Sequence, residues 1–145
     1  LSTKTWVFIW KVPSGTTRFM TISDSGSYFG IAISGSTSSN PVGGHSIWTG
    51  ESRSVTVNGS SVVSNRGVFY SAMDNGKFNT NVFQGIKADY NSGNNAKWQA
   101  YTSDTYRTPT DVRAVLCYDT ILSASNLQTI HNWFDDEGVD MDTWS

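Results

Sequence analysis

The stretch that decides the fold is Asp111-Val-Arg-Ala-Val-Leu-Cys-Tyr-Asp119, followed directly by Thr120-Ile-Leu-Ser-Ala-Ser-Asn-Leu-Gln-Thr-Ile-His-Asn-Trp-Phe134. The first half alternates between apolar and other side chains, which is the period of a β-strand with one face in a core. We expect four residues on that inner face: Val112, Ala114, Leu116 and Tyr118. The second half changes to helical spacing, with Leu127, Ile130 and Phe134 on one side. A buried strand is therefore predicted to run straight into a short amphipathic helix.

The start of this helix carries its own signals. Ser123 stands where an N-cap residue belongs, and Leu122 and Leu127 are spaced as a hydrophobic staple across it. Near the other end, Trp133 and Phe134 are adjacent, so only one of the two can face the core. The pattern predicts a capped helix that closes an otherwise β-rich chain.

Composition sets the limits on fold class. The chain has 145 residues, 13% aromatic and 15% charged side chains, and a net charge of −2. This length fits one domain, and aromatic strands joined by polar turns fit the composition. No apolar run approaches the roughly 20 residues of a membrane helix. Because the chain begins at Leu1, we expect a processed chain or a piece of a longer protein.

The remainder of the chain is predicted as short strands. Thr5 to Val12 alternates, with Trp6, Phe8 and Trp10 on one face. Asn58-Gly59 between two alternating runs indicates a tight hairpin, because both turn positions need positive φ. Further strands are expected at residues 18–23, 28–34, 46–49, 67–73, 82–86 and 98–101. Short strands at this spacing suggest a two-sheet sandwich.

A family resemblance rests on the closing segment. Tyr118-Asp119, the apolar pair Ile121-Leu122 and the helix start at Ser123 resemble the end of concanavalin A-like, laminin-G-type domains. The chain departs from that pattern at two scaffold positions, since the family often has an acidic residue at Ala114 and a basic one at Thr120. The resemblance implies an all-β, two-sheet antiparallel sandwich (a jelly roll) with one short C-terminal α-helix. We expect this domain to span 1–134, with 135–145 as a solvated, disordered acidic tail.

The sequence does not favour an enzyme. Glycoside hydrolysis on such a fold needs two carboxylates across a cleft, and the glucanase strand motif Glu-x-Asp-x-x-Glu is absent. The glutamates are Glu51, beside a glycine, and Glu137, in the acidic tail. Cys117 on a strand is expected to be a small core residue, and His131 a surface or half-buried helical residue. Neither histidine lies in a zinc-binding pattern.

Calcium is the cofactor that the sequence leaves open, although we expect no cofactor. Five carboxylates crowd the C-terminal region: Asp135, Asp136, Glu137, Asp140 and Asp142. They lack the spacing of a calcium loop and follow a helix, so a solvated tail explains them better. The aspartates at strand ends could ligate a metal, but turn chemistry accounts for them equally: Asp24, Asp74, Asp89 and Asp111. No basic cluster indicates nucleic acid as a partner.

The best candidate for ligand binding is the Asn-rich stretch from Asp89 to Trp98 with the aromatic residue that follows it. Sugar recognition uses aromatic faces for the ring and short amides or carboxylates for its hydroxyls. The candidate site residues are Asp89, Tyr90, Asn91, Asn94, Asn95, Trp98 and Tyr101. The alternative is that the aromatic residues are strand core and the polar ones ordinary turn residues. A second, weaker candidate rim runs from Asn40 to Trp48 and includes His45.

These observations lead to one functional expectation and one alternative. The expected function is a non-catalytic, lectin-like recognition or adhesion module for a glycan or glycosylated surface. Such a module would belong to a larger extracellular or virion protein, for example a phage tail or appendage, among other chains of the assembly. The alternative is a structural domain that decorates or joins an assembly and binds no sugar. Fold alone does not decide between them.

Overall fold

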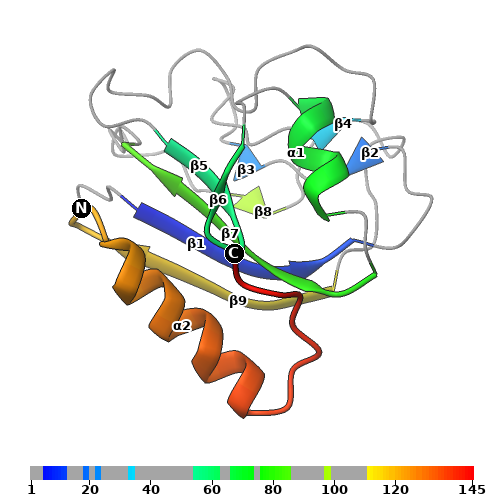
Figure 1. Cartoon of the computed structure of the whole chain (residues 1–145). Coiled ribbons are helices and arrows are strands. Elements are labelled where there is room, and N and C mark those ends of the chain that lie inside the picture. Colours follow the sequence, from blue (N-terminus) through cyan, green and yellow to red (C-terminus); the bar gives the residue numbers. More distant parts are fainter. Residues whose placement is uncertain are drawn as a thin grey trace.

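The computed structural model describes residues 5–12, 18–19, 22–23, 33–34, 54–62, 66–73, 76–85, 97–98 and 111–145. Its main feature is a five-stranded antiparallel sheet in the order β6-β5-β7-β1-β9 (Figure 1). The strands of this sheet are β1 (Thr5–Lys11), β5 (Ser54–Val57), β6 (Ser60–Ser61), β7 (Phe78–Gln84) and β9 (Asp111–Tyr118). Two short antiparallel pairs join β2 (Arg18–Phe19) to β4 (Ile33–Ser34) and β3 (Ile22–Ser23) to β8 (Lys97–Trp98).

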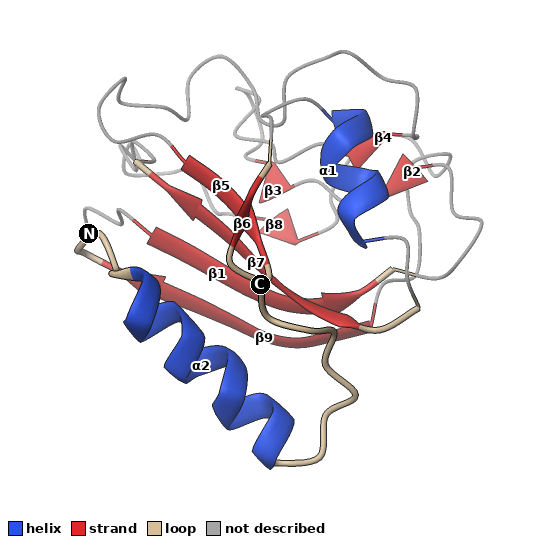
Figure 2. Ribbon diagram, in the orientation of Figure 1, coloured by secondary structure: helices blue, strands red, loops and turns tan. Residues whose placement is uncertain are grey.

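Two helices cover opposite faces of the sheet, α1 (Arg66–Met73) on one and α2 (Ala124–Asp136) on the other (Figure 2). This arrangement confirms an antiparallel β domain with a C-terminal helix. The expected all-β chain with a single helix is wrong, because α1 is a second one. The residues predicted as a strand at 67–73 form this helix.

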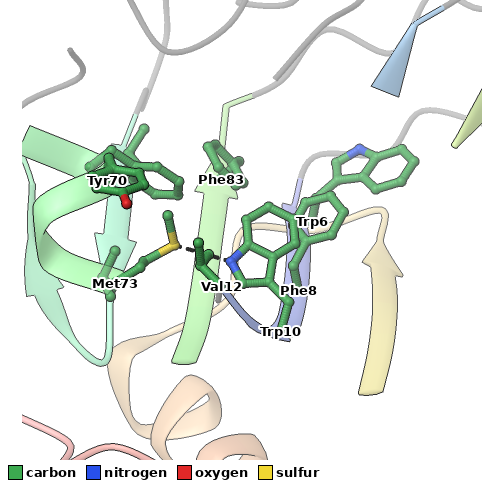
Figure 3. Close-up of a cluster of buried hydrophobic side chains, with 10 residues drawn as sticks. Trp6, Phe8, Trp10, Val12, Tyr70, Met73 and Phe83 are labelled. Atoms are coloured by element: carbon green, nitrogen blue, oxygen red, sulfur yellow. Dashed lines mark hydrogen bonds between the residues drawn. The ribbon is translucent and has the colours of Figure 1, made fainter. Parts of the chain in front are cut away.

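Strand β1 lies inside the sheet and is buried on both faces. Its even-numbered residues Trp6, Phe8 and Trp10 enter the aromatic cluster, as the alternation predicted (Figure 3). We use that name for the buried residues Trp6, Phe8, Trp10, Val12, Val55, Val57, Phe69, Tyr70, Met73 and Phe83. Val7 and Ile9 point the other way, into the helix cluster, which consists of Val7, Ile9, Val82, Leu127, Phe134, Val139 and Met141. A strand between two cores is apolar at nearly every position, as this one is.

Helix α1 is amphipathic and supplies the lid of the aromatic cluster. The helix contributes Phe69, Tyr70 and Met73 to the buried aromatic cluster, whereas its Val68 is exposed. The ring of Phe69 lies 5.3 Å from that of Phe83 on β7. The Trp10 Nε1–H donates to Met73 Sδ at 3.0 Å (Figure 3). This sulfur contact satisfies an indole N–H that would otherwise be buried without an acceptor. Packing of one helical face on the sheet thus overrides the local β preference of Val, Phe and Tyr.

Strand β9 forms an edge of the sheet and carries an irregularity that the alternation did not reveal. Its pairing with β1 shifts between Ile9 and Trp10, so that Ile9 faces Ala114 and Trp10 faces Val112. Arg113 is the extra residue of this bulge. Ala114, Leu116 and Tyr118 pack on the helix cluster, but Val112 packs on the aromatic cluster. The prediction that all four share one face is therefore wrong for Val112, because a bulge reverses which face the strand presents.

The Asn58-Gly59 hairpin between β5 and β6 is confirmed. Both residues have positive φ, 49° for Asn58 and 87° for Gly59, as a two-residue turn of this kind requires. A side chain at position 59 would also have no room. A Cβ atom here would lie 2.7 Å from Cε2 of Trp144 and against the main-chain oxygen of Ser145.

Helix α2 begins and packs as predicted. The Ser123 Oγ accepts a hydrogen bond from the Asn126 N–H at 3.2 Å, which caps the first turn. Leu127 and Phe134 are buried in the helix cluster, and Leu122 and Ile130 are half-buried against it. Trp133 is 56% exposed while Phe134 is 8% exposed, so one of the adjacent aromatic residues faces outward.

The segment from Glu137 to Ser145, here called the C-terminal strap, is not a solvated tail. Val139 and Met141 are buried in the helix cluster. Met141 forms a parallel bridge with Phe78, and the Ser145 N–H donates to the Asn58 main-chain oxygen at 2.8 Å. The expected disorder is wrong because two apolar residues of the strap, Val139 and Met141, alternate with Asp140 and Asp142 and occupy the core.

The other predicted strands fall partly or wholly outside the described residues. The pairing of Arg18–Phe19 with Ile33–Ser34 confirms that the first two short strands associate. Ile22 and Ser23 instead pair with Trp98 and Lys97. Strand β7 begins at Phe78, four residues before the predicted position, because its polar residues Asn79 and Asn81 are buried as well. The strand predicted at 46–49 lies outside the described residues.

Candidate functional site

The predicted sugar-binding residues mostly lie outside the part of the chain that the structure describes. Among them are Asp89, Tyr90, Asn91, Asn94, Asn95 and Tyr101, and the second candidate rim from Asn40 to Trp48 is outside as well. Trp98 is the exception, since its backbone belongs to β8 and pairs with Ile22. Trp98 is thus held on a strand at the end of the Asn-rich stretch. The contacts of the predicted site stay predictions.

A buried polar network links the hairpin, β7, α2 and the C-terminal strap, and the sequence reasoning missed it. It consists of Asn58, Asn79, Thr80, His131 and Asp142, and we call it the Asn58 network. The Asn58 side-chain oxygen accepts from the Thr80 N–H at 2.8 Å. Its amide donates to Asn79 Oδ1 at 2.8 Å and to Asp142 Oδ2 at 3.2 Å. One amide therefore holds three segments that are far apart in the sequence.

His131 extends this network to the helix. It is 4% exposed, and its Nδ1 is 2.9 Å from the Thr80 Oγ1. Its ring also lies 5.2 Å from the ring of Trp144 in the strap. The expectation of a surface or half-buried histidine is wrong, because the helical face that carries Leu127 and Phe134 also carries His131. The histidine thereby joins α2 to β7 and to the strap.

Burial lowers the pKa of His131, since the charged imidazolium loses its water. The charge of Asp135, a main-chain hydrogen bond with Asp142 and the charge of Asp142 act in the opposite direction but do not cancel it. The neutral ring is therefore the form that the fold accommodates at neutral pH. A group of this kind makes stability depend on pH.

We expect the folded state to lose stability as the pH falls through the ordinary histidine range. The unfolded chain binds a proton near pH 6.5, whereas the folded chain resists it until lower pH. The contribution is thus fully present above about pH 6.5 and is lost as the pH falls toward the lowered pKa of His131. Urea unfolding of the wild type and His131→Gln between pH 5 and 8 measures it. Parallel stability curves for the two proteins would contradict this role of His131.

Two buried amides on β7 lie on the aromatic face of the sheet. Asn79 is opposite Trp10 and Asn81 opposite Phe8, and both are fully buried. The Asn79 amide donates to the Lys77 main-chain oxygen at 2.9 Å, and that of Asn81 to the Asn79 main-chain oxygen at 3.0 Å. The Asn81 Oδ1 has no hydrogen-bond partner, which costs about 1–3 kcal/mol. These amides fix the path of β7 into its turn.

Cys117 is not the core residue that was expected. It is exposed, on the edge strand β9, where it faces Trp6 of β1. Desolvation by its surroundings nevertheless raises the pKa of the Cys117 thiol. The thiol is therefore neutral at pH 7 and a poor nucleophile in this state.

The carboxylates considered for calcium have other partners in several cases. Asp140 lies 3.7 Å from Lys77 Nζ, Asp111 lies 3.5 Å from Lys11 Nζ, and Asp142 accepts from Asn58. Within the described residues, no group of three or more His, Cys, Asp or Glu side chains could hold a metal ion. Asp24, Asp74 and Asp89 lie outside those residues.

Chemically, the Asn58 network acts as a clamp. Asn58, Asn79, Thr80 and His131 are buried, Asp142 is half-buried, and hydrogen bonds join them, with His131 beside the Thr80 hydroxyl. Comparison of the chain with models of protein families, with curated proteins and with solved structures found no match. In the part of the chain that the structure describes, neither helix is long and apolar enough to cross a membrane.

Proposed function

We propose that this chain is a non-catalytic recognition module for a glycan or glycosylated surface, carried on a larger extracellular or virion protein. The observation that carries the proposal is the Asp89–Trp98 stretch, which places amides, a carboxylate and two aromatic residues just before and on β8. A strand-anchored aromatic residue beside polar loop residues suits a pyranose ring and its hydroxyls. The absence of a paired glutamate motif from the sequence supports a module without hydrolytic activity.

The same proposal includes the finer fold, a two-sheet jelly roll of the concanavalin A-like, laminin-G type. Its support is the Tyr118-Asp119 segment leading into the Ser123-capped helix, and the aromatic first strand. The short pairs β2–β4 and β3–β8 would then belong to the second sheet. They lie on the α1 side of the main sheet (Figure 1).

A purely structural role in an assembly is the second candidate. It is favoured by one feature of the described residues, the long edge strand β9 with its exposed side chains. In that case the chain contacts other protein chains and binds no sugar. The two functions make different demands on the same residues, so one set of variants separates them.

We expect the protein to bind at least one glycan on an array screened with and without calcium. Tyr90→Ala and Trp98→Ala should each weaken that binding about tenfold or more, or ~1.4 kcal/mol, because each removes an aromatic face. Trp133→Ala is the matched control, since Trp133 is an exposed aromatic residue on α2, outside the proposed site. Circular dichroism of each variant checks that the fold is retained.

Binding to no glycan in either condition would overturn the recognition function and leave the structural one. Equal losses in Tyr90→Ala, Trp98→Ala and Trp133→Ala would place the ligand elsewhere. Loss of binding only when calcium is removed would support a metal-assisted site near the strand-end aspartates.

A further inference from the structure

The two edges of the main sheet are finished differently. At one edge, β6 is only two residues long, and its Ser60 hydroxyl lies 2.6 Å from the Ser145 hydroxyl of the C-terminal strap. At the other edge, β9 runs for eight residues. No strand among the described residues pairs with its outer side (Figure 2). A long open edge presents unpaired N–H and C=O groups to another strand.

Exposed apolar side chains lie along this edge of the sheet. Val115 is 36% exposed and Cys117 is also exposed. Ile121, just past the strand, is 42% exposed. By their pairing with Phe8 and Trp6, Val115 and Cys117 lie on the aromatic face of the sheet, beyond the cover that α1 provides. Charged residues flank this apolar pair, Arg113 before it and Asp119 after it, and both are exposed.

We infer that β9 pairs antiparallel with β9 of a second copy of this chain, which joins two five-stranded sheets into one. The charged residues of β9 and its end favour a second copy of this chain as the partner. When Leu116 lies opposite Leu116 of the second copy, Val115 lies opposite Cys117, and Arg113, at the bulge, comes beside Asp119, the residue just past the strand. The two-fold symmetry makes each of these pairs twice. The apolar residues then meet each other in the middle, and opposite charges meet at both ends.

Other registers lose this match. A shift of this register by one residue sets side chains that face the helix cluster opposite side chains of the other face of the sheet. A centre at Val115 sets Arg113 opposite Cys117 and breaks both ion pairs. A centre at Arg113 sets two arginines against each other, and like charges directly opposite are destabilising. The bulge at Arg113 leaves Ala114 to Tyr118 regular and able to form the ladder.

The register can be tested with the thiol that the chain already carries. Val115→Cys sets a second thiol opposite Cys117 of the other copy, at the separation of directly opposed strand residues, which suits a disulfide. Mild oxidation should then give a covalent dimer on a non-reducing gel. Val68→Cys, at an exposed position of α1, is the control and should give no covalent dimer on the gel. The wild type should give none either, because Cys117 does not face itself across the non-covalent dimer.

Sedimentation velocity over a concentration series tests the association without oxidation. The wild type should form a dimer, and Arg113→Asp should raise its dissociation constant about tenfold. The double variant Arg113→Asp with Asp119→Arg should restore the wild-type value. These positions are exposed, so folding should not change. A monomer at every concentration would overturn the inference. A dimer that survives Arg113→Asp and does not cross-link through Val115→Cys would overturn it as well, since the contact would lie elsewhere.

Discussion

Phe134→Ala should lower the free energy of unfolding by about 3–5 kcal/mol, the usual cost of removing a buried phenylalanine ring. Phe134 is 8% exposed and packs in the helix cluster, so its loss leaves a cavity between α2 and the sheet. Its neighbour Trp133 provides the matched control on the same helix. Because Trp133 is 56% exposed, Trp133→Ala should cost less than about 1 kcal/mol. Urea denaturation followed by circular dichroism measures both.

The difference between these two variants is the informative quantity. Trp133 touches Phe134 edge to face, with ring centroids 4.8 Å apart, so a small cost for Trp133→Ala is expected. Equal costs for the two variants would mean that α2 packs through a different face. A cost below about 0.5 kcal/mol for Phe134→Ala would mean that the helix is not docked on the sheet.

Asn58→Ala should lower the free energy of unfolding by roughly 2–4 kcal/mol, because buried partners lose their hydrogen bonds. The Thr80 N–H and Asn79 Oδ1 would both lose the Asn58 side chain, and alanine would be strained at φ 49°. Denaturant unfolding at pH 7 measures the change. Hydrogen exchange of the Ser145 amide, which donates to the Asn58 main-chain oxygen, reports on the strap.

Asn58→Gly separates the two causes of this loss. Glycine accepts positive φ without strain but supplies no side-chain hydrogen bonds. Asn58→Gly should therefore lower the free energy of unfolding by about 1–2 kcal/mol less than Asn58→Ala does. If Asn58→Gly is as stable as the wild type, the Asn58 side chain does not clamp the strap and the network has no energetic role.

Patterns among neighbouring residues predicted β1, α2 and the Asn58-Gly59 turn. The alternation of Trp6, Phe8 and Trp10 marks β1, and the Ser123 cap with Leu127 and Phe134 marks α2. The Asn58-Gly59 turn follows from the φ angles that only a few residues adopt. In each case the residues that form the element also carry the information that specifies it.

Helix α1 could not be predicted in this way. Val68, Phe69 and Tyr70 favour strands as individual residues, and the helix is short. What stabilises it is the distant face of β1 and β7, on which Phe69, Tyr70 and Met73 pack. The reversed face of Val112 is similar, since the bulge that causes it is visible only in the pairing of β9 with β1.

The strap and its clamp were missed for a different reason. Val139 and Met141 do alternate with Asp140 and Asp142, so a strand-like signal was present, but the acidic composition outweighed it. The buried position of His131 also had a signal, because it shares a helical face with Leu127 and Phe134. The candidate sugar-binding residues, by contrast, were chosen by composition, and only the backbone of Trp98 falls in the described part of the fold.

The order of the strands has a consequence for how the chain folds. Both neighbours of β1 in the sheet, β7 and β9, come much later in the sequence, and the Thr5 hydroxyl donates to the Thr120 main-chain oxygen across 115 residues. Such distant closures are slow, because the entropy of a long loop is lost before any contact compensates for it. During synthesis the aromatic row of β1 therefore leaves the ribosome before both of its neighbours in the sheet. The aromatic rings of β1 stay uncovered until α1 and β7, whose side chains pack on them, have been made.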